Sequence, residues 1–406
     1  MASNSDRRQY DLECRDAVHG FVYLSAAEWA VVDCPTFQRL RDIRQLAMAH
    51  LVYPGATHTR FEHSIGVLHL CDRIYHAVGR QVQQNNCHTF AEAFRVDRRQ
   101  VERGLQVVRL AGLLHDLGHA PFSHSGENLM PQVHKNGKTR MMNHEEMTAK
   151  LIRETEVCET LSSEFGGEIV EEVIAVATET EFAHLPDDAK LAWFRFLNEI
   201  LTGELGADRM DYLLRDALHS GQSAGLFDHH KLIDSMIIVP PPKETGQEHR
   251  LGVDEAGWLI AEQMVAARYL MYVALYFHKT KRIYEIHLEH FLREWLKKKF
   301  KAPHFPTDSS KYMTLTDSSV WAAIYQAAYT KTSKLRALAR PFVDRSHLRL
   351  AYEVLLADNC DPVVSDPVLG AFLHGFDSAK ESAKKFAESG TFDHSTKPTN
   401  LGRRSI

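Results

Sequence analysis

Apolar residues recur at helical spacing along most of this chain. In residues 101–117, for example, Leu105, Val108 and Gly112 fall on one face of a helix, and Gly118 follows as a stop signal. The same spacing predicts further helices over residues 62–80, 145–161, 168–180, 189–203, 207–219, 255–300 and 318–330. The last but one of these is longer than a usual globular helix, so we expect it to break or bend once. The expected fold class is therefore all-α, or mainly helical.

One stretch departs from helical spacing. Residues 232–242 and 249–253 are apolar segments on either side of a turn-like hexapeptide, which predicts a small β-hairpin. Near the C-terminus the apolar periodicity is lost, which is typical of disorder. The expected organisation is a catalytic core over 1–230, a hairpin insertion over 231–255, a mixed but largely helical C-terminal lobe completing the pocket over 256–376, and a disordered tail over 377–406.

Composition narrows the class of protein. The 406 residues are 44% hydrophobic and 25% charged, which is ordinary for a soluble globular protein. A net charge of −5 argues against a non-specific nucleic-acid binder, which would carry a basic balance. The six cysteines have no paired spacing, the first residues are polar, and no run of 18 apolar residues occurs. We therefore expect reduced thiols, no membrane segment and a cytoplasmic location.

Histidines cluster where one of the expected helices ends. His115 and Asp116 stand next to each other before Gly118, and His119 and His124 follow closely. Imidazole and carboxylate groups together suit zinc, iron or manganese, and both side chains can reach one ion because the backbone turns away beneath them. The plainer interpretation is a helix C-terminus whose histidines interact with the helix dipole. Three histidines within ten residues favour the metal site.

A second segment opens an expected helix with Arg60 and His63 at i and i+3, and therefore on one face. His63 can supply a metal ligand while Arg60 directs a bidentate fork at an anion. The alternative is a surface ion pair between Arg60 and Glu62.

Two further helical segments carry polar side chains in line. Asp208, Tyr212 and Asp216 recur every four residues and form a stripe that suits a metal followed by a sugar-like ligand, although such stripes are usually solvated faces. Arg268 and Tyr276 lie eight residues apart among apolar neighbours. An arginine there is more often a buried ion-pair partner than a ligand contact.

The order and content of these motifs resemble the HD-domain metal phosphohydrolases. The match is close to the branch of deoxynucleoside triphosphate (dNTP) triphosphohydrolases that combines a SAM domain with an HD domain. The motifs are Asp16 to Gly20, Phe37 to Leu40, Gln45 and Leu46, Tyr53 to Ser64, the block from His115 to His124, and Ala207 to Tyr212. The ordered set is far more specific than any single His-Asp pair.

The resemblance implies a site and a reaction. It assigns a divalent metal (iron, manganese or zinc) to His63, His115, Asp116 and Asp208. It places His119, His124, Glu127 and His144 near the scissile phosphate. It maps Gln45 and Leu46 to the nucleoside, Arg60, Arg209 and Arg268 to the phosphates, and Tyr212, Asp216 and Tyr276 to the sugar. The implied reaction is hydrolysis of a dNTP, accompanied by magnesium, to deoxynucleoside and triphosphate. A homo-oligomer, dimer or tetramer, is implied as well, with a nucleotide activator as a possible partner.

Three departures from the family pattern stand out. The chain begins almost directly in the catalytic region, so we expect no SAM domain. Tyr272 stands where the family has a histidine, and Glu127 stands where it has an aspartate.

The general acid is assigned to His124 oriented by Glu127, with His119 and His144 as competing candidates.

Two other functions remain compatible with these residues. The same metal site can serve a nucleotidase, or a nuclease acting at a single strand or a 3′ end, which would need an open basic groove. A nucleotide-binding regulator with impaired catalysis is the third hypothesis. The complete set of four metal-ligand candidates argues against it.

Overall fold

Two long helices, α3 (Arg60–Gln84) and α5 (Arg98–Leu114), pack against each other at the centre of the fold. The two helices approach closely at Gly112 of α5, which has no side chain. A Cβ at this position would lie 3.1 Å from Cys71 Sγ and 3.3 Å from the backbone nitrogen of Leu68. Both neighbours belong to α3. The computed structural model describes residues 12–84, 89–135, 138–178, 188–241, 248–331 and 333–348, and residues Met1–Leu350 form one compact unit.

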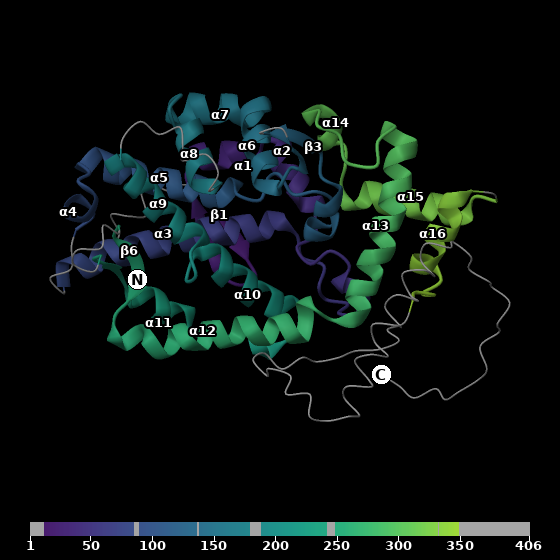
Figure 1. Ribbon diagram of the computed structural model, residues 1–406. Coiled ribbons are helices and arrows are strands. Elements are labelled where there is room, and N and C mark those ends of the chain that lie inside the picture. The colour runs from purple at the N-terminus through teal and green to yellow at the C-terminus, as the bar shows by residue number, and fades with distance from the viewer. Residues whose placement is uncertain are drawn as a thin grey trace. The chain divides into compact units, whose positions relative to one another are not determined.

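Other helices surround this central pair (Figure 1). α10 (Ala207–Ser220) packs on α3, whereas α8 (Ile169–Ala177) and α9 (Asp188–Thr202) pack on α5. The remaining helices of the first half are α1 (Ala26–Val32), α2 (Pro35–Gln38), α4 (Phe90–Phe94), α6 (His144–Glu154) and α7 (Glu156–Phe165). The core consists of aliphatic and aromatic side chains from all of these elements. The metal-ligand candidates on α3, on α10 and directly after α5 therefore start from adjacent, well-packed supports.

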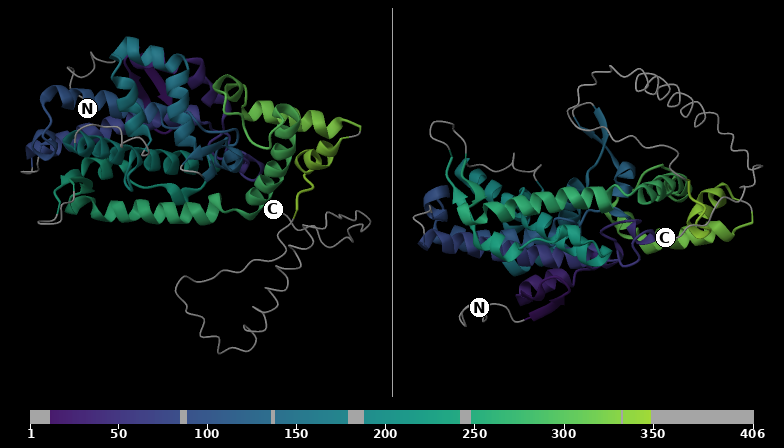
Figure 2. Two further views of the ribbon diagram at one scale, coloured as in Figure 1. Left: turned by 45° about the horizontal axis from the view of Figure 1, so that its top comes forward. Right: turned by 90° about the horizontal axis from the view of Figure 1, so that it is seen from below.

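The C-terminal half of the unit continues as helices. α11 (His229–Asp234) leads through a hairpin to α12 (Trp258–Met271), a π-helical turn over Tyr272–Tyr276 and α13 (Lys279–Phe300). Figures 1 and 2 show α13 leaving the end of α12 in a different direction. The chain then forms α14 (Ser309–Met313), α15 (Asp317–Tyr329) and α16 (Lys334–Val343). The predicted break in the segment 255–300 is confirmed, and it falls beside Tyr276.

Three two-stranded antiparallel hairpins complete the described part of the chain. They pair β1 (Leu12–Asp16) with β2 (Gly20–Leu24), β3 (Gln132–Lys135) with β4 (Lys138–Met141), and β5 (Met236–Val239) with β6 (Arg250–Val253). The mainly helical class and the presence of the third hairpin are confirmed, but its expected first segment begins too early, because Leu232–Asp234 belong to α11 and the strand starts at Met236. The first two hairpins were not predicted, because their strands of four or five residues carry too short a pattern to distinguish them from loops.

Two predicted helix boundaries are wrong. The helix expected over 101–117 ends at Leu114, so His115 and Asp116 follow the helix rather than belonging to it. The helix expected over 145–161 is two helices separated at Thr155, whose extended backbone interrupts α6 and α7. The division into four segments stays a prediction, and the expected tail over 377–406 lies outside the described residues. No described helix is both long enough and apolar enough to cross a membrane.

Candidate metal centre and adjoining pocket

Four side chains from three helices converge on one buried point. His63 comes from α3, His115 and Asp116 from the turn after α5, and Asp208 from the first turn of α10. His63 Nε2 lies 3.1 Å from Asp208 Oδ1 and 3.5 Å from Asp116 Oδ2. His115 Nε2 lies 3.4 Å from Asp116 Oδ1 and 3.7 Å from Asp208 Oδ1. The structure thus brings together all four residues that the resemblance assigns to the metal.

The donor set fits a divalent cation. His115 Nδ1 donates to the carbonyl of Gly112 at 2.9 Å, which leaves the lone pair on Nε2. That Nε2 is buried and has no hydrogen-bond partner. Burial opposes ionisation of Asp116, but the Arg60 guanidinium holds the pKa of its carboxyl well below the usual range. A free imidazole nitrogen facing ionised carboxylates is the arrangement that a transition-metal ion requires.

Arg60 connects this centre to a neighbouring loop. Its Nη1 donates to Asp116 Oδ2, and its Nε donates to Ser123 Oγ at 2.8 Å. The Ser123 hydroxyl donates onward to the carbonyl of Arg44 at 2.7 Å. The side chain of Arg60 is 3% exposed, so the alternative of a surface ion pair with Glu62 is wrong. Arg60 therefore fixes the orientation of one candidate ligand from behind.

A second histidine group lies next to the metal-ligand candidates. Glu127 bridges two imidazoles, since its Oε1 lies 2.5 Å from His144 Nδ1 and its Oε2 lies 3.1 Å from His124 Nδ1. The His119 ring stacks on the His144 ring at 4.1 Å, and His119 Nε2 lies 3.3 Å from Asp116 Oδ1. Despite its burial, Glu127 has a lowered pKa because of the hydrogen bonds to both histidines. The four predicted catalytic residues are thus one connected group.

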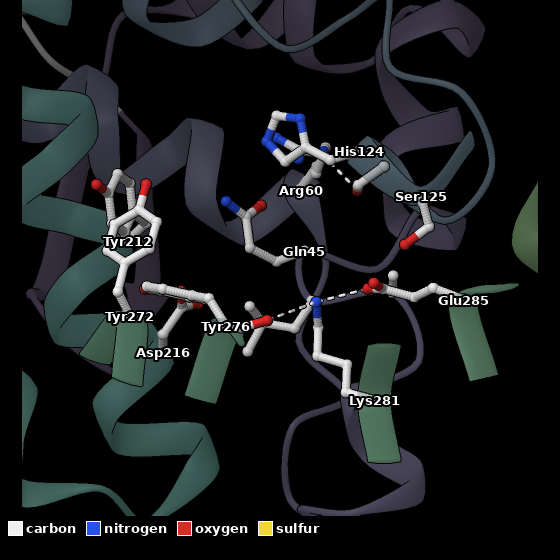
Figure 3. Close-up of a pocket in the computed structure, with 13 residues that line it drawn as sticks. Gln45, Arg60, His124, Ser125, Tyr212, Asp216, Tyr272, Tyr276, Lys281 and Glu285 are labelled. Atoms are coloured by element: carbon white, nitrogen blue, oxygen red, sulfur yellow. Dashed lines mark hydrogen bonds and ion pairs between the residues drawn. The ribbon is translucent and has the colours of Figure 1, made fainter. Parts of the chain in front are cut away.

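A cavity of about 270 Å³ is lined by His124 of the second group and by Arg60, the hydrogen-bond partner of Asp116. Its lining residues are Gln45, Leu46, Ala47, Arg60, Ser123, His124, Ser125, Tyr212, Asp216, Tyr272, Tyr276, Lys281 and Glu285. Six of the eight predicted substrate contacts are among them. Figure 3 shows the three tyrosines gathered near Asp216, away from His124. The pocket therefore has one aromatic wall and one wall that carries Arg60 and His124.

Asp216 is fixed between two partners at the aromatic wall. Its Oδ2 accepts a hydrogen bond from the Tyr276 hydroxyl at 2.7 Å, and its Oδ1 lies 2.7 Å from His58 Nε2. The His58 ring stacks on the ring of His219 at 4.5 Å. Each carboxylate oxygen has a second lone pair, so Asp216 can still accept a hydrogen bond from a sugar hydroxyl.

Two predicted phosphate contacts, Arg209 and Arg268, do not line the cavity. Both reach Glu204 instead: Arg268 Nη1 donates to Glu204 Oε2 at 2.9 Å, and Arg209 Nη2 lies 3.2 Å from Glu204 Oε1. Glu204 is largely exposed. The Arg268 guanidinium also lies 5.9 Å from the ring of Tyr272, which does line the cavity. The two arginines therefore share one carboxylate next to the pocket.

Asp317 at the start of α15 anchors two loops of the pocket. Its Oδ1 accepts from the backbone N–H of Phe122 at 2.7 Å, and its Oδ2 accepts from that of Arg44 at 3.1 Å. Burial raises the pKa of this carboxyl to about 7. Phe122 and Ser123 both have positive φ, of 61° and 53°, so this strained turn needs such an external support. Asp317 thereby sets the position of the loop that carries His124.

Comparisons with known proteins show the family to which the chain belongs. The HD domain profile matches residues 60–216, and a profile described as an HD associated region matches residues 227–348. A hypothetical protein from Aquifex aeolicus has a crystal structure with a TM-score of 0.62 and 36% sequence identity, covering 82% of this chain and 75% of that one. The chain belongs to the HD-domain family.

Two curated relatives match this chain over part of their length. The uncharacterized protein MJ1154 of Methanocaldococcus jannaschii is 30% identical over 271 residues, which are 66% of this chain and 46% of that protein. Human deoxynucleoside triphosphate triphosphohydrolase SAMHD1 is 32% identical over 238 residues, 54% of this chain and 34% of that protein. The chain thus spans about half or less of the length of these relatives.

Sequence reasoning missed several polar residues around the HD domain's pocket. Ser123 and Ser125 flank His124; Ser123 belongs to the block from His115 to His124 and Ser125 directly follows it, so their proximity to His124 was an available signal. Lys281 Nζ lies 2.5 Å from Glu285 Oε1, and their i, i+4 spacing shortly after Tyr276 was an available signal. Ala47 carries no polar group, and nothing in the sequence indicated its position.

Proposed function

We propose that this protein is a metal-dependent phosphohydrolase that converts dNTPs to deoxynucleoside and inorganic triphosphate. The observation that carries the proposal is the position of the His63, His115, Asp116 and Asp208 cluster beside a cavity lined by Arg60, His124 and a tyrosine wall. A nucleotide's phosphates and sugar need these two kinds of surface next to each other. The human relative bears the name of the same activity.

The residues of this chain divide the work as follows. His63, His115, Asp116 and Asp208 would hold an iron, manganese or zinc ion, which would supply an activated water as the nucleophile near neutral pH. Arg60 contributes positive charge where the phosphates meet the pocket. A magnesium ion that accompanies the nucleotide would neutralise part of the remaining phosphate charge.

A histidine protonates the leaving oxygen in this proposal. His124 lines the pocket, and its Nδ1 is within 3.1 Å of Glu127, so its Nε2 is the nitrogen that can face the substrate. Glu127 orients His124 and His144 together. We assign the general acid to His124, with His144 and His119 as neighbours in the same group.

The tyrosine wall supports a sugar and base at the other end. The rings of Tyr212 and Tyr272 lie 6.3 and 5.1 Å from that of Tyr276, whose hydroxyl is bound to Asp216. Gln45 and Leu46 complete the nucleoside side of the cavity. This arrangement favours a single nucleotide over a nucleic-acid strand as the substrate.

The proposal also includes a homo-oligomer. Several large apolar side chains of the α12 region are exposed, including Trp258 (64%), Tyr269 (69%) and Phe277 (65%). Exposed apolar residues concentrated on one region are typical of protein–protein contact surfaces. Association of identical chains, as a dimer or tetramer, would cover them.

The deciding experiment is product identification. Purified protein loaded with manganese or iron is incubated with each dNTP, each ribonucleotide and a short single-stranded DNA, with and without a second nucleotide as activator. We expect inorganic triphosphate and deoxynucleoside from at least one dNTP. Release of monophosphate or pyrophosphate alone would replace the proposal by a nucleotidase or nuclease, and nucleotide binding without turnover under every condition would favour a regulator.

Glu204 should compete with the phosphates for Arg209 and Arg268. We expect Glu204→Gln to lower KM for the dNTP by about two- to fivefold, which is the range for loss of an exposed ion pair, while kcat changes little. Steady-state kinetics at low salt measure the effect. Glu199→Gln is the matched control, because Glu199 pairs with Arg250 and lies outside the pocket lining. An unchanged KM for Glu204→Gln would remove the two arginines from phosphate binding.

A further inference from the structure

The first family motif, Asp16 to Gly20, has no role in the site described so far. It forms the turn of the β1–β2 hairpin, in which Asp16 pairs with Gly20. Asp16 Oδ1 accepts from the backbone N–H groups of Val18 and His19, both at 2.9 Å, and Gly20 takes a positive φ of 76°. This Asx-type turn fixes the direction in which His19 leaves the hairpin.

His19 points into the protein toward Asp211. Its Nε2 lies 2.7 Å from Asp211 Oδ1, and neither side chain has any exposed surface. The other carboxylate oxygen, Oδ2, lies 2.7 Å from Nδ1 of His63, which is also fully buried. Since His63 Nε2 faces the metal-ligand candidates, His19 is connected to the centre through one carboxylate.

Arg215 completes the surroundings of Asp211. Its Nε donates to Asp211 Oδ2 at 2.8 Å and its Nη2 donates to Oδ1 at 2.9 Å, so each oxygen receives one guanidinium and one imidazole contact. Its Nη1 donates to Asp16 Oδ2 at 2.8 Å, which brings the chain of contacts back to the hairpin. Asp211 is therefore a charged acceptor in a fixed position.

Gly66 on α3 provides the space for this network. A Cβ at that position would lie 2.0 Å from Asp211 Oδ1 and 2.4 Å from Arg215 Nη2. His63 stands one turn earlier on the same helix, so α3 both carries the imidazole and leaves room for the carboxylate behind it. The contact is thus built into the packing of α3 against α10.

We infer that His19 and Asp211 are positioning residues for the metal centre: the hairpin holds Asp211, and Asp211 fixes the ring and tautomer of His63 so that its Nε2 lone pair faces the metal. A carboxylate behind a ligand imidazole commonly changes metal affinity by about 10- to 100-fold. His19 acts one contact further out, through the oxygen that His63 does not use. His19 Nδ1 is buried with no hydrogen-bond partner, which places the ring proton on Nε2, where Asp211 accepts it.

The test compares two replacements of His19. His19→Leu keeps an apolar bulk but removes the donor, whereas His19→Gln places an amide N–H near the position of Nε2. We expect His19→Leu to weaken Mn²⁺ binding by about tenfold in a chelator competition and to alter the visible spectrum of the Co²⁺ form. We expect His19→Gln to stay within about twofold of the wild type. The thermal unfolding midpoints of both metal-free variants should match each other.

This inference rests on the metal centre proposed above. Mn²⁺ binding by the wild-type protein distinguishes failure of the metal centre from failure of the positioning role. If the wild-type protein binds no Mn²⁺, the centre itself is refuted. If it binds Mn²⁺ and His19→Leu binds equally well, or if both variants lose affinity equally, only the positioning role is overturned. Nitrogen-15 spectra of the histidines in the wild type provide a readout should a variant not fold. A His19 ring proton on Nδ1 would then contradict the inference.

Discussion

Replacing His115 and Asp116 together by alanine is expected to abolish metal binding and hydrolysis at once. The double change removes an imidazole whose Nε2 has no other hydrogen-bond partner, and a carboxylate within 3.5 Å of His63. Loss of the ion removes several kcal/mol of transition-state stabilisation, and about 1.4 kcal/mol corresponds to a tenfold rate, so turnover should fall at least about a thousandfold. Metal content by mass spectrometry and triphosphate release are measured on the same samples.

His76→Ala is the matched control for this loss. His76 lies on α3, is 51% exposed and pairs with Asp72, and it is not one of the metal-ligand candidates, so metal content and turnover should stay at the wild-type level. Because removing Asp116 also leaves Arg60 without its carboxylate partner, circular dichroism should show that the double variant is folded. Folded protein that keeps its turnover without the two residues would remove the metal centre from the mechanism.

Replacing Glu127 by glutamine is expected to lower kcat by about a hundredfold while leaving the bound metal in place. The glutamine side chain is of equal length, but it removes the charge that lies 2.5 Å from His144 Nδ1 and 3.1 Å from His124 Nδ1. A correctly positioned general acid increases the rate by about 10²- to 10⁴-fold. In this variant His124 and His144 lose the carboxylate that orients both of them. Steady-state kinetics with the preferred dNTP measure kcat and KM separately.

The metal content of Glu127→Gln tells the two groups of the site apart. If the metal is lost as well, Glu127 supports the metal centre rather than proton transfer. Glu154→Gln on α6 is the control, since Glu154 forms an exposed ion pair with Lys150 and should leave kcat unchanged. A normal kcat for Glu127→Gln would reassign the acid to a group that does not depend on this carboxylate.

The sequence predicted the helical class and the family better than it predicted the boundaries of the elements. Long apolar repeats gave α3, α9, α10 and α15 nearly to their ends, because burial of one face determines where such helices lie. The end of α5 was placed three residues too late, since Leu117 continues the apolar spacing although the chain has already turned. The short hairpins carry too few residues to show a period, so only the one with flanking apolar runs was found.

In the candidate site, too, residues within a sequence pattern were easier to predict than contacts between distant segments. Residues within a recognisable motif, such as His63 and Asp208, were placed together correctly by resemblance, although no spacing in the chain indicates that they lie 3.1 Å apart. Asp211 is not among the expected site residues, because it falls outside the four-residue spacing of Asp208, Tyr212 and Asp216. Its neighbours His19 and His63 come from distant segments. Such contacts depend on tertiary packing, which one sequence alone does not reveal.

Asp317 has a consequence for how the chain can be divided. It belongs to the HD associated region, yet its two oxygens hold backbone groups at Arg44, before the HD domain match begins, and at Phe122, inside it. Arg39 connects the same two regions, because it donates hydrogen bonds to the carbonyl of Leu315 in the HD associated region and to that of His119 in the HD domain. The two matched regions are therefore not exchangeable modules. A fragment that stopped at the HD domain boundary would keep the metal-ligand candidates but lose the contacts that support the loop beside them.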